Sequence, residues 1–463
     1  MSEQSRIFLH THSNLFWGHQ QWQAGDFLAT TSSFISQLED FGVGHADKVV
    51  YAIDKHPFSF LWCELALSQI DCLLIPCNFQ YTQKGFFEIK KHICPSYILT
   101  DSRTLALWIS KTDNSCITHL IEAPDGTKLH LLKLPDQNTR QKNELTGTIL
   151  MSSGTSHYRR YSLQSSQNFR TSIEAFSSTS IFEKRKDYLN LLPLYFSGGR
   201  KVFYSCLKNN IHIHFPPNEQ TDDFCDITSG TPNLLESFIS HKKNIQNVRF
   251  ICGGAPLSNK LIELACTKQV EVYNVYGLSE TSSIASFNTP QHHKLGTVGK
   301  LCTLNEYKIQ DKTLRIKGPS VCAFQFIDGE AKQVLEDGWL DSRDIATIDD
   351  DGYLILQGRI DDEIKMGNGM FINLATIHKI LEKYFTDFSF FIQADTQNRL
   401  ILYIPDLKIH HAQELSQRCT TVNQQEIFKI HALCFFKISP ANGIPFSKQI
   451  IVNSDDIRQY IEI

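Results

Sequence analysis

The 463-residue sequence predicts an α/β protein with a large, multi-subdomain N-terminal domain and a small α+β C-terminal domain joined by a hinge. Apolar strands alternate with amphipathic helices over the first half of the chain, a pattern typical of parallel sheets. From about residue 296 short alternating strands take over, and residues 359–463 carry helices and strands of their own. The length exceeds what one hydrophobic core usually supports, so two or more domains are expected.

The first elements alternate between helix and strand. A helix over 26–43 would place Phe27, Phe34 and Leu38 on one face and end at Gly42. The segments expected next are a strand over 48–53, a helix over 58–68, a strand over 72–76, a helix from Gln83 and a strand over 96–99. This order predicts a parallel-type sheet covered by helices.

The same order continues downstream. Strands are expected over 148–151, 187–194 and 248–252, and Thr231 and Pro232 supply an N-cap and a first-turn proline for a helix over 233–239. Strands at 307–309, 314–316 and 353–355 indicate a β-rich subdomain. The C-terminal elements expected are helices over 374–384 and 412–417 and strands over 388–393, 400–404 and 434–438. We predict an N-terminal domain over 1–358, with the subdomain over about 296–358, and a mobile C-terminal domain over 359–463.

Bulk composition indicates the class of protein and its compartment and argues against nucleic acid as a partner. The apolar fraction of 41% and the charged fraction of 20% are those of an ordinary globular protein, and the net charge of −4 gives no electrostatic reason to bind nucleic acid. Thirteen cysteines without a Cys-x-x-Cys pair indicate buried thiols in a reducing compartment. No signal peptide or membrane-spanning run is found, so we expect a cytoplasmic protein.

A serine-rich loop follows the strand expected over 148–151. Its residues are Ser152, Ser153, Gly154, Thr155 and Ser156. Such a loop can direct N–H and O–H groups at phosphate oxygens, although it lacks the Gly-x-x-x-x-Gly-Lys pattern. Arg159 and Arg160 could then neutralise phosphate charge. An ordinary turn followed by a solvated arginine pair is the structural alternative.

Two further turns have the chemistry of a nucleotide site. Gly253, Gly254 and Ala255 end a strand, where paired glycines would let a flat ring approach the backbone. A tight strand-to-helix connection explains them equally well. The second turn combines an aromatic ring, a hydroxyl and a carboxylate suited to Mg²⁺, and a buried Tyr-Gly bend is its structural alternative. The residues of the second turn are Tyr276, Gly277, Ser279 and Glu280.

Charged residues in the last third of the sequence are further candidates for the nucleotide site and for catalysis. Asp344 and Arg359 would form a salt bridge by default, but Asp344 could also accept two hydrogen bonds from a ribose diol. Lys448 stands on a Pro/Ser turn. Most such lysines are solvated, whereas one carried into a cleft could stabilise charge developing at a carboxylate and a phosphate.

Taken in order, these segments resemble the adenylate-forming (AMP-binding) superfamily of acyl- and aryl-CoA ligases, adenylation domains and luciferases. The likeness covers nearly the whole chain and is most specific over 339–365, with further landmarks at 296–300 and 315–319. It implies ATP, Mg²⁺ and a CoA or phosphopantetheine thiol as cofactors.

The resemblance also implies roles for individual residues. Ser152 to Ser156 and Arg160 would form the phosphate loop, and Ser279 would contact phosphate. Glu280 would hold Mg²⁺ and, with Ser279 and Lys448, belong to the catalytic set. The remaining roles are a nucleoside site of Gly253, Gly254, Ala255, Tyr276, Gly277, Asp344 and Arg359, a hinge at Asp361, a thiol channel at Gly367 and Gly369, and an acyl pocket at Tyr195, Phe196 and Gly198.

Departures from the family pattern concentrate at the phosphate loop. The family continues Thr-Gly-x-Pro-Lys-Gly, whereas residues 157–161 read His-Tyr-Arg-Arg-Tyr, so Arg160 replaces the lysine. Arg343 stands where the family has a glycine, Phe196 replaces a frequent histidine, and 373–377 lacks the usual Pro-x-Glu pattern.

The implied activity has two steps. A small or medium carboxylic acid would be activated to an acyl-adenylate and then transferred to a thiol, with CoA as the first expectation. A stand-alone adenylation enzyme that loads an acyl carrier protein is an alternative. A non-catalytic nucleotide- or acyl-binding protein is the alternative from another class, suggested by the altered loop.

Overall fold

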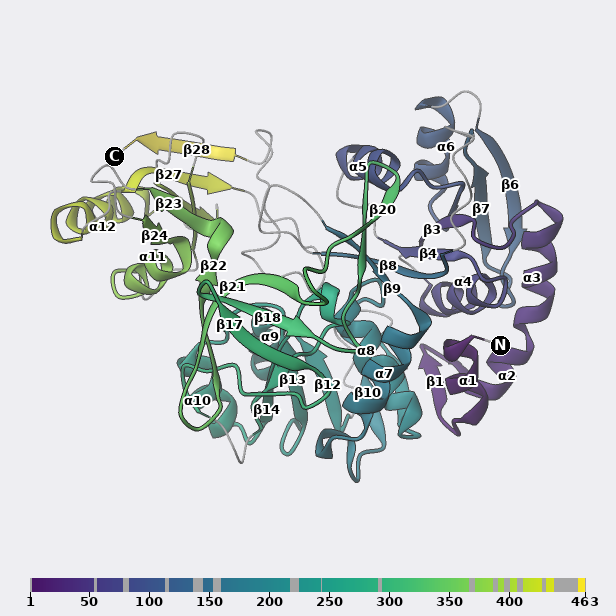
Figure 1. Ribbon diagram of the computed structural model, residues 1–463, viewed down its shortest axis with the longest axis horizontal. Coiled ribbons are helices and arrows are strands. Elements are labelled where there is room, and N and C mark those ends of the chain that lie inside the picture. The colour runs from purple at the N-terminus through teal and green to yellow at the C-terminus, as the bar shows by residue number, and fades with distance from the viewer. Residues whose placement is uncertain are drawn as a thin grey trace.

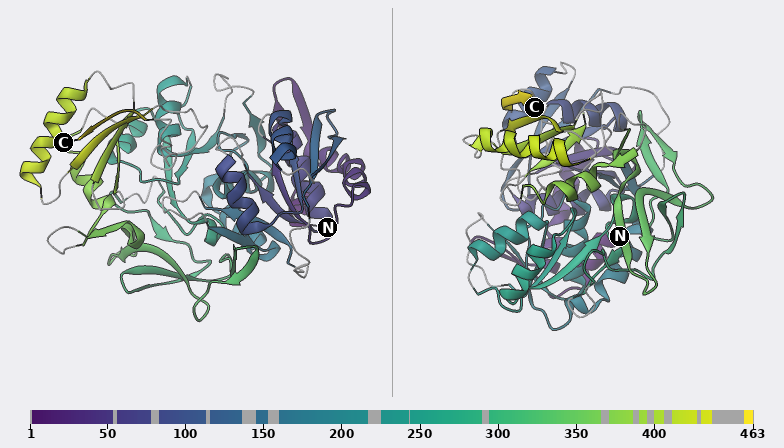
Figure 2. Two further views of the ribbon diagram at one scale, coloured as in Figure 1. Left: turned by 90° about the horizontal axis from the view of Figure 1, so that it is seen from above. Right: turned by 90° about the vertical axis from the view of Figure 1, so that its left-hand side faces the viewer.

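The computed structural model shows a large part and a smaller C-terminal part, with the two chain ends at opposite ends of the long axis (Figures 1 and 2). The residues it describes are 2–53, 56–77, 83–112, 116–135, 145–152, 160–216, 225–242, 244–289, 294–365, 371–385, 390–394, 400–405, 411–426, 430–436 and 457–462. The α/β fold class expected from the sequence is confirmed.

Two nine-stranded sheets form the framework of the large part. The first runs, in spatial order, β16 (Lys300–Leu301), β15 (Ser286–Phe287), β14 (Glu271–Tyr276), β13 (Arg249–Gly253), β12 (Ile227–Gly230), β10 (Asp187–Leu189), β11 (His212–Phe215), β1 (Asn14–Trp17) and β2 (Gln20–Gln23). The second runs β20 (Glu330–Gln333), β19 (Phe324–Ile327), β9 (Tyr161–Gln164), β8 (Gly147–Met151), β4 (Leu73–Pro76), β3 (Lys48–Ala52), β5 (Tyr97–Thr100), β7 (Lys128–Lys133) and β6 (Ile117–Glu122). Their central strands pair in parallel.

Helices cover the sheets and share a core rich in aromatic side chains. They are α1 (Glu3–His10), α2 (Ala24–Ala29), α3 (Thr31–Asp40), α4 (Pro57–Gln69), α5 (Gln83–Ile93), α6 (Arg103–Thr112), α7 (Ser166–Ser177), α8 (Ser197–Lys208), α9 (Pro232–His241) and α10 (Asn259–Thr267). Glu64 on α4 pairs with Arg200 on α8 at 2.7 Å, and both are buried. Two buried charges tolerate little displacement, so this pair fixes the packing of α4 against α8.

A four-stranded sheet joins the two parts of the molecule. Its strands are β17 (Glu306–Gln310), β18 (Thr313–Lys317), β21 (Leu340–Ile348) and β22 (Leu354–Arg359), and the 3₁₀ turn η4 (Ile360–Asp362) leads on from β22. The C-terminal part comprises β23 (Glu363–Lys365), β24 (Phe371–Asn373), α11 (Leu374–Leu381), β25 (Phe391–Ala394), β26 (Leu400–Pro405), α12 (Ala412–Gln425), β27 (Ile430–Phe436) and β28 (Ile457–Glu462). Its core cluster draws only on residues after 373.

The single helix expected over 26–43 is wrong, because the chain forms α2 and α3 with a break at Thr30. The carbonyl of Phe27 accepts from the Thr30 hydroxyl at 2.8 Å and from Trp62 Nε1 at 3.3 Å. Side chains thus take over an acceptor that a continuous helix would pair with a backbone N–H.

The strand expected over 187–194 is also too long. It ends at Leu189, since the Asn190 side chain donates to the Leu192 carbonyl at 3.0 Å and Pro193 has no N–H to offer a ladder. Thr231 does cap α9 as expected, accepting from Leu234 N at 3.4 Å. The C-terminal elements exist where expected, although α12 extends to Gln425 and β27 begins at Ile430. Within the described ranges, no helix is long and apolar enough to cross a membrane.

Candidate active site

The serine-rich loop is the turn of the hairpin between β8 and β9. Met151 pairs with Tyr161, and Ser152 N donates to the Arg160 carbonyl at 2.9 Å. Arg160 N donates in return to the Ser152 hydroxyl at 2.9 Å. These two bonds join the residues that flank the loop and fix Arg160 beside Ser152. Ser153, Gly154, Thr155 and Ser156 lie outside the described residues, so their part in the phosphate loop stays a prediction.

The turn after β14 requires its glycine for reasons of space. A Cβ at Gly277 would lie 1.4 Å from the Ser283 carbonyl oxygen. A Cβ at Gly253 would lie 2.6 Å from the Val275 side chain, and Gly254 has a φ of +83°. Packing and turn geometry therefore account for these glycines by themselves, and a role for them in binding adenine remains a prediction.

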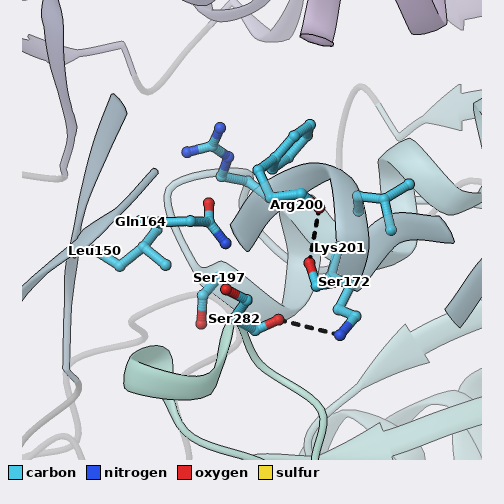
Figure 3. A pocket seen from close by; sticks show the side chains of 9 residues that line it. Leu150, Gln164, Ser172, Ser197, Arg200, Lys201 and Ser282 are labelled. Atoms are coloured by element: carbon cyan, nitrogen blue, oxygen red, sulfur yellow. Dashed lines mark hydrogen bonds between the residues drawn. The ribbon is translucent and has the colours of Figure 1, made fainter. Parts of the chain in front are cut away.

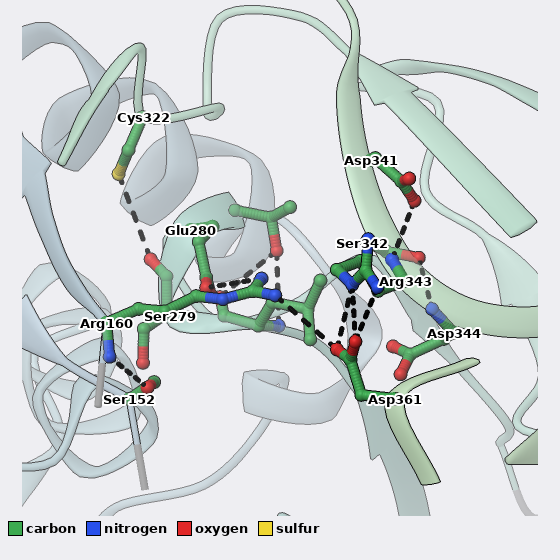
Figure 4. Close-up of polar contacts among 12 residues, drawn as sticks. Ser152, Arg160, Ser279, Glu280, Cys322, Asp341, Ser342, Arg343, Asp344 and Asp361 are labelled. Carbon is green, nitrogen blue, oxygen red and sulfur yellow. Dashed lines mark hydrogen bonds and ion pairs between the residues drawn. The ribbon is translucent and has the colours of Figure 1, made fainter. Parts of the chain in front are cut away.

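Glu280 lies in the 3₁₀ turn η2 (Ser279–Thr281) and is only 4% exposed. Its Oε1 is 3.4 Å from Nη1 of Arg160, the one cation that pairs with it among the described residues. Figure 4 shows the Arg160 side chain reaching from Ser152 past Glu280 towards Asp361. Behind this turn, burial and then the charge of Glu280 raise the pKa of the Cys322 thiol to about 12, which keeps the thiol neutral.

Asp344 and Tyr276 form the second half of the site. The Tyr276 hydroxyl donates to Asp344 Oδ2 at 2.5 Å, and Asp344 is 6% exposed. Burial and the neighbouring carboxylate raise the pKa of Tyr276 well above its usual value. The guanidinium of Arg359 lies 3.7 Å from Asp344, while its buried Nε has no hydrogen-bond partner among the described residues. A buried donor without an acceptor is expected where a ligand supplies one.

A third contact was not anticipated from the sequence. Arg343 makes a bidentate pair with Asp361, with Nε at 2.9 and 2.8 Å from the two carboxylate oxygens and Nη2 at 2.5 Å. Arg160 Nη2 lies 3.8 Å from the same carboxylate. The hydrogen bonds from Arg343, together with the charges of Arg343, Arg359 and Arg160, hold the pKa of Asp361 below its usual value against the opposing effect of partial burial. The opposite charges of Arg343 and Asp361 were visible in the sequence, but their meeting depends on the β21–β22 register.

The expected acyl-pocket residues lie at the start of α8. Tyr195 and Phe196 stack obliquely with ring centroids 4.6 Å apart, and both are half-buried. A small cavity lies next to them, lined by Ser197, Arg200, Lys201 and Ser282 among others, but not by Tyr195, Phe196 or Gly198. In Figure 3 Lys201 points at the Ser282 carbonyl, to which its Nζ donates at 3.1 Å. Gly367 and Gly369, expected at a thiol channel, and Lys448, expected to be catalytic, lie outside the described residues, so these roles stay predictions.

The donor chemistry fits magnesium held together with a nucleotide. Glu280 supplies one buried carboxylate, and Ser279 next to it supplies a hydroxyl 3.5 Å from that of Ser197. No cluster of three or more His, Cys, Asp or Glu side chains that could hold a metal occurs in the described segments. Mg²⁺ commonly takes one or two carboxylates together with phosphate oxygens and water, so this set suits Mg·ATP better than a free-standing metal cage.

Comparison with known proteins agrees with this arrangement. A family profile for AMP-binding enzymes matches residues 9–321. A 2-succinylbenzoate–CoA ligase of Staphylococcus epidermidis is 28% identical over 245 residues, which are 48% of this chain and 51% of that protein. A 4-coumarate–CoA ligase-like protein of Oryza sativa is 34% identical over 155 residues, covering 29% of this chain and 28% of its own. The matched part of the chain thus spans about half the length of the first of these relatives.

Solved structures show the same fold over the full length. O-succinylbenzoate coenzyme A synthetase of Bacillus subtilis in complex with AMP has a TM-score of 0.76 at 17% identity, covering 98% of both chains. The same enzyme with ATP and magnesium has a TM-score of 0.73 at 18% identity, covering 95% of this chain and 96% of that one. Because the family profile covers most of the sequence, the chain belongs to the family of AMP-binding enzymes.

Proposed function

We propose that the protein uses ATP to convert a carboxylic acid into an acyl-adenylate and then transfers the acyl group to the thiol of coenzyme A. The observation that carries this proposal is the convergence of three distant segments. Arg160 from the β8–β9 hairpin contacts Glu280 after β14 and Asp361 after β22, next to Asp344. Family membership and the CoA ligases among the similar proteins support the same reaction.

The chain's own groups suit the first step. Asp344 can accept the ribose hydroxyls, with Tyr276 and Arg359 holding its carboxylate. Ser152 and Arg160 can hold phosphate oxygens. A substrate carboxylate oxygen attacks the α-phosphorus, the bond to pyrophosphate breaks, and Lys448 is proposed to stabilise the developing charge. Magnesium held at Glu280 would offset the charge of the phosphates.

The second step needs a thiol in place of Lys448. The thiol sulfur attacks the acyl carbonyl, loses its proton, and AMP leaves. We propose that the C-terminal part turns about Asp361 between the steps and brings Gly367 and Gly369 to the thiol. Its core is separate from those of the large part, as such a movement requires.

The acid is proposed to be small or medium-sized and aromatic. Tyr195 and Phe196 offer two rings at the start of α8, and the similar ligases are named for 2-succinylbenzoate and 4-coumarate. Aromatic side chains favour contact with a flat, apolar substrate body; neither ring lines the small cavity beside α8.

The test is ATP–pyrophosphate exchange across a panel of aromatic and aliphatic carboxylic acids, with Lys448→Ala as the control. Exchange with at least one acid, lost in Lys448→Ala, is the expected outcome. Absence of exchange with every acid, in a protein that binds ATP, would refute acid activation. Thioester formation measured with CoA and with a phosphopantetheinylated acyl carrier protein then identifies the acceptor.

A nucleotide-binding protein without turnover is the second candidate, and the pairing of Arg160 with Glu280 favours it. An arginine held against the metal-binding carboxylate would compete with magnesium. This candidate predicts ATP affinity that does not depend on magnesium and no pyrophosphate exchange with any acid.

A further inference from the structure

The connector between the two parts of the molecule is held by a side chain that the family pattern does not provide. The large part keeps its own cores, among them a cluster of Ala285, Leu314, Leu340 and Leu354 around the four-stranded sheet. The C-terminal core lies entirely after residue 373. The chain passes once between them, through η4. Residues 360–362 therefore connect the two parts, beside a direct contact in which the Asn373 side chain of β24 donates to the Arg359 carbonyl of β22.

Arg343 on β21 makes the strongest contact to this connector. The strands β21 and β22 pair as far as Asp344 and Arg359. The Arg343–Asp361 pair lies just past the end of that ladder and continues it with three side-chain hydrogen bonds. Arg160 approaches the same carboxylate only at 3.8 Å.

The backbone of Arg343 is strained in this arrangement. Its φ of +62° is in the left-handed region, which is unfavourable for a non-glycine residue. A strained conformation persists where its surroundings compensate for it. Two contacts do so: the bidentate pair with Asp361, and the bond from Arg343 N to Asp341 Oδ1 at 2.8 Å.

We propose that Arg343 is a positioning residue that clamps the Asp361 carboxylate and holds the C-terminal part in the orientation of this structure. A guanidinium fork that binds both carboxylate oxygens fixes direction as well as distance, which a lysine cannot do. The side chain is 42% exposed and so is accessible to salt. Rotation of the C-terminal part then requires the pair to break.

The direct test is hydrogen–deuterium exchange of the peptide covering residues 360–365 in the full-length protein. Arg343→Gly removes the side chain and relieves the backbone strain, and Arg343→Asn removes the charge with a residue that tolerates this φ. We expect amide exchange about three- to tenfold faster in both variants and an intermediate value in Arg343→Lys. Raising the salt concentration should accelerate exchange in the wild type but not in Arg343→Gly.

A matched control is available in Lys294. It is also 42% exposed and pairs with Asp349 and Asp351 at 2.8 and 2.7 Å, away from the connector. Lys294→Ala should leave exchange at 360–365 unchanged. Unchanged exchange in Arg343→Gly and Arg343→Asn, or an equal increase in Lys294→Ala, would overturn the proposal.

The consequence for turnover rests on the proposed function. If the two half-reactions use different orientations, Arg343→Gly should change the ratio of the pyrophosphate-exchange rate to the thioester-formation rate by about threefold or more, with an unchanged KM for ATP. A ratio equal to that of the wild type would contradict a positioning role. Should the wild type show no exchange with any acid, the proposed function fails while the deuterium measurement still decides on the clamp.

Discussion

The two hairpins that meet at the candidate site follow the family pattern to different degrees. The β21–β22 hairpin carries partly exposed ion pairs, Arg343–Asp361 and Arg359–Asp344, in the segment that most resembles the family. The β8–β9 hairpin has lost the family's loop residues and instead places Arg160 against the buried Glu280. The residues expected to bind the nucleoside and those expected to bind the phosphates therefore lie on separate segments. The first segment departs from the family pattern at Arg343, and the second departs over residues 157–161.

The largest effect is expected from a change at Glu280, the carboxylate proposed to hold magnesium. Glu280→Gln keeps the shape of the side chain but removes its charge, so we expect pyrophosphate exchange to fall by about a hundredfold or more. ATP affinity without magnesium should change little. Glu336→Gln, which affects a remote pair with Arg315, is the control. Equal losses in the two variants would point to a general effect on folding.

A smaller effect is expected on the ribose side. Asp344→Asn weakens an acceptor of ribose hydroxyls, so ATP and AMP should bind about tenfold more weakly in titration calorimetry. The control is Asp341→Asn, which alters a carboxylate on the same strand that pairs with Arg315 and accepts from Arg343 N. Similar affinity in Asp344→Asn and the wild type would remove Asp344 from the site.

The link between the two hairpins can be tested through Arg160. Because Arg160 lies beside Glu280, Arg160→Ala should lower the magnesium concentration for half-maximal exchange by about threefold, even if the maximal rate also falls. A higher magnesium requirement would show that Arg160 and the metal do not compete.

The smallest effect concerns the free energy of unfolding and comes from Lys201 on α8, whose Nζ donates to the Ser282 carbonyl. Burial lowers the pKa of Lys201 to about 8. Between about pH 8 and about pH 10.4, the unfolded chain keeps a proton on Lys201 that the native state has lost. The free energy of unfolding therefore rises with pH over this range. Lys201→Met removes this increase in the free energy of unfolding with pH. The variant should therefore be more stable relative to the wild type at pH 7 than at pH 10 in urea denaturation. A constant difference would contradict the shift.

Much of the fold follows from local sequence, and one of the two wrong predictions has a remote cause. The alternation of strands and helices and the cap at Thr231 predicted β8, α4 and α9 because those signals lie within each segment. The break between α2 and α3 depends on Trp62, more than thirty residues away, whose indole bonds to Phe27. Such a contact leaves no local pattern.

The site shows the same division. The order of motifs predicted that Ser152, Glu280, Asp344 and Arg359 belong together. Arg160, hydrogen-bonded to Ser152, reaches Glu280, and Arg359 lies 3.7 Å from Asp344. It did not predict that Arg343 would clamp Asp361, because two residues 18 apart meet only through the register of β21 and β22. The sequence showed Arg343 only as a departure from the glycine that the family has at this position.

The central claim is that ATP is cleaved at the α-phosphorus. The most direct measurement is the nucleotide product formed from α-labelled ATP with an accepted acid and coenzyme A. We expect AMP and pyrophosphate in amounts equal to the thioester formed. ADP and phosphate as products, or no nucleotide product in a protein that binds ATP and the acid, would contradict it.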